Sequence, residues 1–160
     1  MALSLKRRII DHLIAERKHA LSELESIAER AHNEAIHSEN KSDGKYDTRA
    51  IEAGYLAGAQ LKRTEAARRE LAALTQLSDQ ALNGPIQVGA LVRLKGEEIE
   101  KKIFLAPTTG GQILDWPEGK IQIVSKASPW GEELLGRQRE EEVELESPRG
   151  SQFYQIIEVI

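Results

Sequence analysis

Two long stretches of helix-forming sequence are separated by Ser38-Glu39-Asn40-Lys41-Ser42-Asp43-Gly44-Lys45-Tyr46-Asp47-Thr48. This segment concentrates residues that favour turns and helix caps, and Gly44 is the expected turn point. Asp47 or Thr48 can cap a following helix, because a side-chain oxygen there accepts a hydrogen bond from a free main-chain N–H group. So short a connection predicts that the two helices run antiparallel.

Both flanking stretches carry an apolar pattern typical of a helix pair. Before the turn there is no Gly or Pro from Leu3 to Ser38, and apolar residues recur at alternating spacings of three and four. These residues are Ile10, Leu13, Ala20, Leu24, Ile27 and Ala31. After the turn, 48–82 holds a looser stripe that includes Ile51, Tyr55, Leu56, Ala59, Leu71, Leu74 and Leu77, interrupted by Gly54 and Gly58. We expect an antiparallel coiled-coil hairpin over 1–82, with its tip near 39–48 and a length of about 50 Å.

Composition divides the 160 residues near Asn83-Gly84-Pro85. All five prolines and all five valines follow residue 84, whereas 15 of 18 alanines precede it. Alanine favours helices, valine favours strands and proline interrupts helices. The chain is therefore expected to be α+β, with a helical hairpin followed by a β domain at 86–160.

Short strands separated by turn signals are expected in this second half. They are 88–94, 102–106, 120–124, 143–146 and 153–159, which together favour an antiparallel sheet. One short helix is expected after Ser128, because Ser is a good N-cap, Pro129 suits the first helical position and Gly136 suits the end. The second half shows no nucleophile paired with a base, no phosphate-binding Gly loop and no metal-ligand cluster.

Net charge and cysteine content exclude several classes of protein. The formal net charge is −4, which does not suit a strongly basic nucleic-acid binder. There is no cysteine, so a disulfide framework and a thiolate metal site are excluded. No apolar run approaches the ~20 residues of a membrane span. We expect a cytoplasmic protein with no membrane partner.

Charged residues in the hairpin suggest two candidate sites. Asp43 and Asp47 at the expected tip offer hard oxygen ligands to a divalent cation held by another protein, since one or two carboxylates alone bind Mg²⁺ poorly. The alternative is a capped polar turn. The second helix carries a basic patch that could contact phosphates, or form a solvated face with i,i+4 pairs. This basic patch consists of Lys62, Arg63, Arg68 and Arg69.

The C-terminal sequence contains a signature with the pattern Ser-Pro-x-Gly-x-x-Leu-Leu-Gly, formed by Ser128, Pro129, Gly131, Leu134, Leu135 and Gly136. This signature resembles that of the Gre-type transcript cleavage factors of bacterial RNA polymerase. An acidic-apolar strand, the turn Pro148-Arg149-Gly150 and a final strand at 154–159 follow it, as in the family. The resemblance covers about the last 35 residues, and the order of a coiled coil before this domain also agrees.

This resemblance implies a fold and a function. The fold is an N-terminal antiparallel coiled-coil helical hairpin followed by a small FKBP-like antiparallel β domain with one short helix. The β domain, through the signature residues, would dock on RNA polymerase, and the hairpin would enter its secondary channel. There Asp43 and Asp47 would assist a Mg²⁺ shared with the polymerase active site in cleaving backtracked RNA, while the basic patch would face nascent RNA. The factor would be a monomer and a cofactor, not an enzyme.

Three other functions stay open. In the family an Asp and a Glu stand three residues apart at the tip, whereas here Asp43 is followed at that distance by Tyr46 and then by Asp47. A Gre-like regulator that binds polymerase without stimulating cleavage therefore fits the residues too. An FKBP-like prolyl isomerase or chaperone, and a coiled-coil interaction module without a polymerase partner, are the remaining alternatives.

Overall fold

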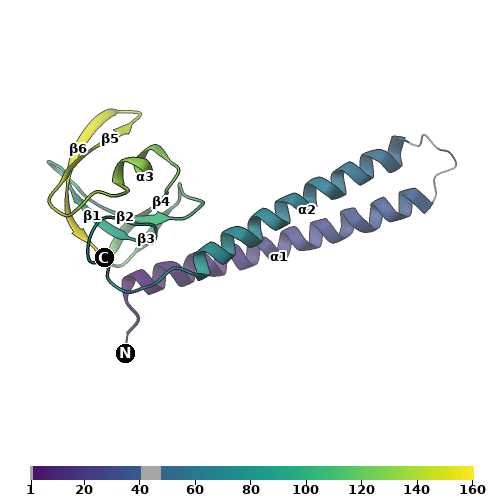
Figure 1. The fold of residues 1–160 in the computed structure, drawn as a ribbon, viewed down its shortest axis with the longest axis horizontal. Helices are drawn as coiled ribbons and strands as arrows, with labels where there is room; N and C mark the ends of the chain where they lie inside the picture. The colour runs from purple at the N-terminus through teal and green to yellow at the C-terminus, as the bar shows by residue number, and fades with distance from the viewer. Residues whose placement is uncertain (1, 41–47) are drawn as a thin grey trace. The chain divides into compact units, whose positions relative to one another are not determined.

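The computed structural model describes residues 2–40 and 48–160 (Figure 1). Two helices come first, α1 at Leu5–Asn40 and α2 at Thr48–Thr75. The strands β1 to β4 and the short helix α3 follow, and β5 and β6 end the chain. Their bounds are β1 Leu91–Lys95, β2 Glu100–Ala106, β3 Ile113–Trp116, β4 Gly119–Ser125, α3 Pro129–Leu134, β5 Glu142–Ser147 and β6 Gly150–Val159.

The chain forms two compact units. One is the hairpin unit, His12–Ala72, and the other is the sheet unit, which joins the residues up to Asp11 to Ala73–Ile160. Helix α1 therefore contributes its first turns to the sheet unit and the rest of its length to the hairpin unit.

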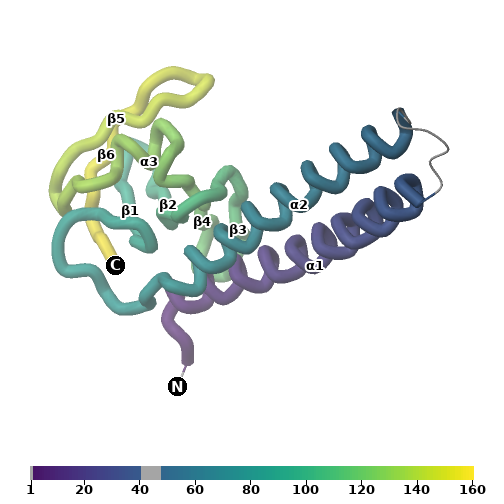
Figure 2. Tube along the Cα trace, turned by 45° about the vertical axis from the view of Figure 1, so that its right-hand side comes forward, coloured from purple at the N-terminus to yellow at the C-terminus, as the bar shows by residue number. Residues whose placement is uncertain are grey.

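Small side chains fill the contact between α1 and α2, which lie side by side in both views of the hairpin unit (Figures 1 and 2). Ala31 and Ala35 are buried on α1. On the part of α2 that belongs to the hairpin unit, Thr64 is buried; its hydroxyl donates to the main-chain oxygen of Gln60 at 2.9 Å and lies 3.5 Å from that of Leu24. Alanine and threonine occupy little volume, so they allow the two backbones to approach closely.

The expected apolar stripe of α2 is wrong in its first turns. Ile51 and Leu56 are about half exposed and Tyr55 is 77% exposed. The face turned inward carries Ala50, Ala53, Ala57 and Gln60, which are partly buried. In these turns the alanines form the partly buried face of α2, and the larger apolar side chains are exposed.

Helix α2 also ends earlier than expected, at Thr75 instead of Leu82. The main-chain N–H of Leu77 donates to the oxygen of Leu74 at 3.2 Å, as in a terminal turn. The Leu77 side chain packs against Gly89, where a β-carbon would lie 3.1 Å from Cδ2, and Leu82 packs on the core of the sheet unit. Leu77 and Leu82 therefore pack within the sheet unit, and the helix ends before them.

The sheet has six strands in the order β3-β4-β2-β1-β6-β5. It is mixed: four of its neighbouring pairs are antiparallel, but β2 and β4 are parallel. The expected all-antiparallel sheet is corrected here, because the unpredicted strand β3 turns back into β4 and β4 then runs in the same direction as β2.

Both faces of the sheet contain buried side chains. On one face alternate residues such as Val92 and Leu94 of β1 join a core that α3 supplies with Leu134. The full core is Ile86, Ala90, Val92, Leu94, Ile103, Leu105, Val124, Leu134, Val143, Leu145, Tyr154 and Ile156. On the other face Phe104 and Ile121 are fully buried. Successive side chains of a strand point to opposite faces, so these strands contribute buried residues to both sides of the sheet.

Candidate functional site

The end of the hairpin was the first predicted site. Helix α1 ends at Asn40 and α2 begins at Thr48. The two predicted carboxylates, Asp43 and Asp47, lie outside the described residues, so their role stays a prediction. Among the described residues, Glu52 in the first turns of α2 has an exposed side chain.

The four residues of the basic patch do not share one face of α2. Each residue turns the helix by about 100°, so Lys62 and Arg69, seven apart, point in nearly the same direction, whereas Arg63 and Arg68 lie to the two sides. All four are exposed. Arg68 pairs with Glu25 of α1 at 3.1 Å, so part of its charge is used within the hairpin. Lys62 and Arg69 are therefore the two members of the patch that can contact one external phosphate group from the same side of α2.

The signature around α3 is built into the fold of the sheet unit. The main-chain N–H of Gly131 donates to the hydroxyl of Ser128 at 3.1 Å, which caps the helix, and this hydroxyl donates to the oxygen of Ser125 at 2.7 Å. A β-carbon on Gly131 would lie 2.0 Å from the same Ser125 oxygen. Only glycine fits so close to the end of β4, and Ser128 and Gly131 therefore fix α3 on the sheet.

The remaining signature residues divide into buried and exposed ones. Leu134 is fully buried in the core, and Gly136 has φ +80°, which favours glycine. Leu135 is 39% exposed and Pro129 is also exposed. Pro129 and Leu135 are the signature residues that present an exposed apolar side chain.

A shallow cavity of about 360 Å³ lies beside Pro129 and Trp130. The indole N–H of Trp130 donates to the oxygen of Glu146 at 2.6 Å, and the Lys101 ammonium lies 5.5 Å from the ring centre. These contacts hold the ring in one orientation. The remaining lining residues are Gly110, Gly111, Gln122, Ile123, Val124, Ser125 and Ser128. Together they form a largely apolar hollow between the end of β4 and the start of α3.

Sequence reasoning missed a contact between the first turns of α1 and the rest of the sheet unit. Lys6 is 2% exposed, and its Nζ donates to the main-chain oxygens of Gln80 at 2.9 Å and Ile160 at 3.2 Å. Burial lowers the pKa of Lys6, and the nearby Asp79 carboxylate partly opposes this. Partners this far along the chain leave no local signal at Lys6.

Arg8 forms a second part of this contact. Its guanidinium lies 5.1 Å from the ring centre of Trp116 on β3, and it pairs with Glu118. This pairing lowers the pKa of Glu118. An arginine stacked on an aromatic ring and paired with a carboxylate is held in one geometry, so the start of α1 is fixed to the edge of the sheet.

Two classes of feature are absent from residues 2–40 and 48–160. No group of three or more His, Asp or Glu side chains there could hold a metal ion. None of the helices described has the length and apolar character needed to cross a membrane.

Known proteins resemble this chain in sequence. A transcription elongation factor GreA from Bartonella henselae is 35% identical over 94 residues, which is 58% of this chain and 54% of that protein. A second, from Rickettsia canadensis, is 26% identical over 152 residues, 94% of this chain and 87% of that protein. The chain thus spans about half the length of the first relative. Both names agree with the resemblance found in the C-terminal signature.

Other comparisons add less. No protein-family model matches the chain. The crystal structure of the GreA factor homolog 1 (Gfh1) protein of Thermus thermophilus covers 92% of this chain and 94% of its own, with 16% identity and a TM-score of 0.41.

Proposed function

We propose that this chain, a member of the Gre-type family of transcription elongation factors, binds bacterial RNA polymerase and modulates elongation by inserting its hairpin into the secondary channel. The observation that carries the proposal is the similarity to two transcription elongation factors, one along 94% of the chain, together with a hairpin of two long helices. In this role the chain is a cofactor of the polymerase and not itself an enzyme.

The dimensions of the hairpin suit entry into a channel. At about 1.5 Å per residue, the 28 residues of α2 extend about 42 Å. Its contact with α1 uses mostly small side chains, which keeps the two-helix rod thin. Lys62 and Arg69 on the outer surface of α2 would face the phosphates of nascent RNA, with Arg63 and Arg68 at the sides of this patch.

The docking role belongs to the sheet unit. Pro129 and Leu135 are the members of the signature with exposed side chains, Gly136 being exposed but without a side chain, and the apolar hollow beside Trp130 adjoins Pro129. We expect this surface to contact the polymerase, while Ser128, Gly131, Leu134 and Gly136 keep its shape.

Cleavage of backtracked RNA would need the carboxylates between α1 and α2. Two-metal phosphodiester hydrolysis requires a second cation and an attacking water. Asp43, with Asp47 in place of the family's Glu, would supply oxygen ligands to a Mg²⁺ that the polymerase also holds. Because one or two carboxylates bind Mg²⁺ poorly alone, the site would form only in the complex.

A specific sequence observation favours a second mode. Tyr46 occupies the position at which the family has its Glu, so the chain could bind the channel without stimulating cleavage. In that mode the hairpin would modulate elongation by occupying the channel.

Stalled, backtracked elongation complexes separate the two modes. The purified chain is added with Mg²⁺, and release of 3′ RNA fragments is measured above the intrinsic rate. The cleaving mode predicts release that is lost in Asp43→Asn and retained in the control Glu34→Gln, an exposed carboxylate on α1. Polymerase binding without fragment release supports the non-cleaving mode, and the absence of both contradicts the proposal.

A further inference from the structure

Among residues 2–40 and 48–160, no strand pairs with one edge of β6 along its first half. On one side β6 pairs with β5 from Gly150 to Gln155. On the other side its pairing with β1 begins only at Gln155, opposite Lys95, the last residue of β1. The edge over Gly150–Tyr154 therefore has no strand beside it in the described part of the chain.

The main-chain groups on this edge point away from β5. The N–H of Ile156 donates to the oxygen of Glu141 on the β5 side at 2.9 Å. Since hydrogen-bonded and non-hydrogen-bonded positions alternate in an antiparallel pair, Tyr154 and Gln152 also bond toward β5, whereas the N–H and C=O groups of Phe153 and Ser151 point outward. These are the groups that an added strand would use.

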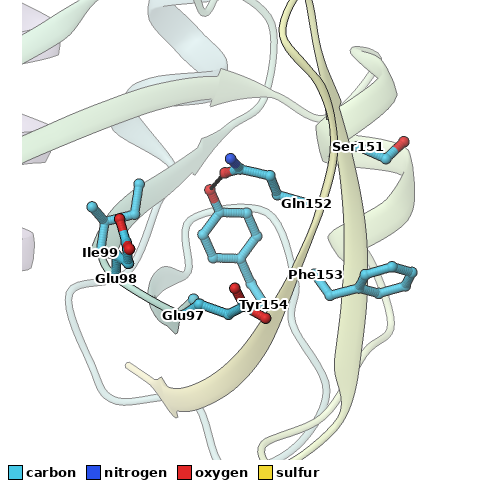
Figure 3. Close-up of a pocket in the computed structure, with 8 residues that line it drawn as sticks. Glu97, Glu98, Ile99, Ser151, Gln152, Phe153 and Tyr154 are labelled. Atoms are coloured by element: carbon cyan, nitrogen blue, oxygen red, sulfur yellow. Dashed lines mark hydrogen bonds between the residues drawn. The ribbon is translucent and has the colours of Figure 1, made fainter.

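A cavity of about 440 Å³ lies beside this edge. Its other wall is the turn between β1 and β2, which Gly96 and Ile99 close with a 2.8 Å main-chain hydrogen bond. In Figure 3 the side chains of Gln152 and Tyr154 lie on the cavity side of β6, and the side chain of Phe153 points away. The cavity thus lies between the turn and an unpaired strand edge, with the buried Tyr154, 3% exposed, beneath it.

The side chains around the cavity give it an acidic character. Glu97 and Glu98 line the turn, are exposed and form no ion pair with any other described residue. The hydroxyl of Tyr154 donates to Oε1 of Gln152 at 2.7 Å, which leaves the amide nitrogen of Gln152 able to donate to a ligand. Lys95 is the nearest basic residue along the chain, so the carboxylates of this turn outnumber the neighbouring basic groups two to one in the sequence.

From this geometry we infer that the edge of β6 over Gly150–Tyr154 binds an extended basic peptide segment. The segment adds as a strand next to β6, and one of its Lys or Arg side chains places its charge beside Glu97 and Glu98. Main-chain hydrogen bonds supply affinity in such strand addition, and side-chain pockets supply specificity. The inference stands without the polymerase, because it concerns a different surface.

Nuclear magnetic resonance titration of the full chain tests the inference. The probe is an acetylated and amidated seven-residue peptide in which lysine alternates with valine, and the comparison peptide has glutamate in place of lysine. We expect saturable shifts of the Gly150–Tyr154 and Gly96–Ile99 amides with the lysine peptide below about 1 mM, and none with the glutamate peptide. Equal shifts with both peptides, or no shift at these amides, would overturn the inference.

Two pairs of variants separate charge from strand addition. Glu97→Gln with Glu98→Gln should weaken lysine-peptide binding about fivefold, as expected for two exposed charge pairs, whereas Glu29→Gln with Glu34→Gln, the same charge change on α1, should not.

Phe153→Pro removes an outward N–H and should abolish binding, but Phe153→Ala should retain it, because this side chain points away from the cavity. Shifts at the edge that depend on protein concentration without peptide would assign it to a second copy and contradict the inference.

Discussion

The ammonium group of Lys6 donates a hydrogen bond to the main-chain oxygen of Ile160, 154 residues along the chain. The same oxygen accepts the N–H of Leu91 at 3.0 Å, at the start of β1. Lys6 also donates to Gln80, in the segment after α2. One buried cation thus joins the first turn of α1 to two other parts of the sheet unit.

Lys6→Met tests this connection. Methionine keeps most of the volume but leaves the oxygen of Gln80 without its donor, so we expect the free energy of unfolding to fall by about 1–2 kcal/mol. Urea unfolding measures it, and Lys18→Met, an exposed position on α1, is the control. A Lys6→Met protein as stable as the original would show that the cost of burying the ammonium cancels its hydrogen bonds.

Gly131→Ala should destabilise the sheet unit by at least about 2 kcal/mol. The added β-carbon would lie 2.0 Å from the oxygen of Ser125 and 2.8 Å from Cα of Lys126, so the main chain must move. Thermal unfolding of the variant checks this. Gly136 has open space around it but a positive φ, so Gly136→Ala should cost less, through backbone strain alone. A larger loss at Gly136 than at Gly131 would refute the packing argument.

Gly54→Ala and Gly58→Ala should each stabilise the hairpin, by about 0.5–1 kcal/mol. Both glycines lie inside α2, and a β-carbon at either would meet no atom within 4 Å. Alanine loses less conformational freedom than glycine on entering a helix. Far-ultraviolet circular dichroism during urea unfolding gives the change, and a lower unfolding midpoint in either variant would show a contact that this account lacks.

Tyr154 should make stability depend on pH in the alkaline range. Burial raises the pKa of its phenol above the ordinary value of 10.0. The folded state therefore holds this proton more tightly than the unfolded state, and stability falls as the pH rises from about 10 through the folded pKa. Tyr154→Phe should flatten this decline and remove one phenolate from an absorbance titration. An unchanged pH dependence would contradict the burial argument.

Much of the fold could be predicted from local patterns, and the exceptions have physical causes. The cap of α3 at Ser128 was predictable because it needs only neighbouring residues. Strand β3 was missed because its four residues include Asp115 and Trp116 and adjoin Pro117, which together suggest a turn. The parallel pairing of β2 with β4 depends on that missing strand.

Some features of the candidate sites could likewise be predicted from local sequence, and others could not. The acidic pair Asp43 and Asp47 is visible in the sequence, whereas the burial of Lys6 depends on partners 74 and 154 residues away. The separation of Lys62 and Arg69 from Arg63 and Arg68 follows from helical geometry, but the pairing of Arg68 with Glu25 needs the register between the two helices.

Direct binding to purified bacterial RNA polymerase tests the central claim. The chain is labelled at an added cysteine in place of Ser22, an exposed position on α1, and titrated with core polymerase while fluorescence anisotropy is recorded. We expect saturable binding with a Kd below about 10 μM, reversed by excess unlabelled chain. No rise in anisotropy up to about 100 μM polymerase would contradict the account.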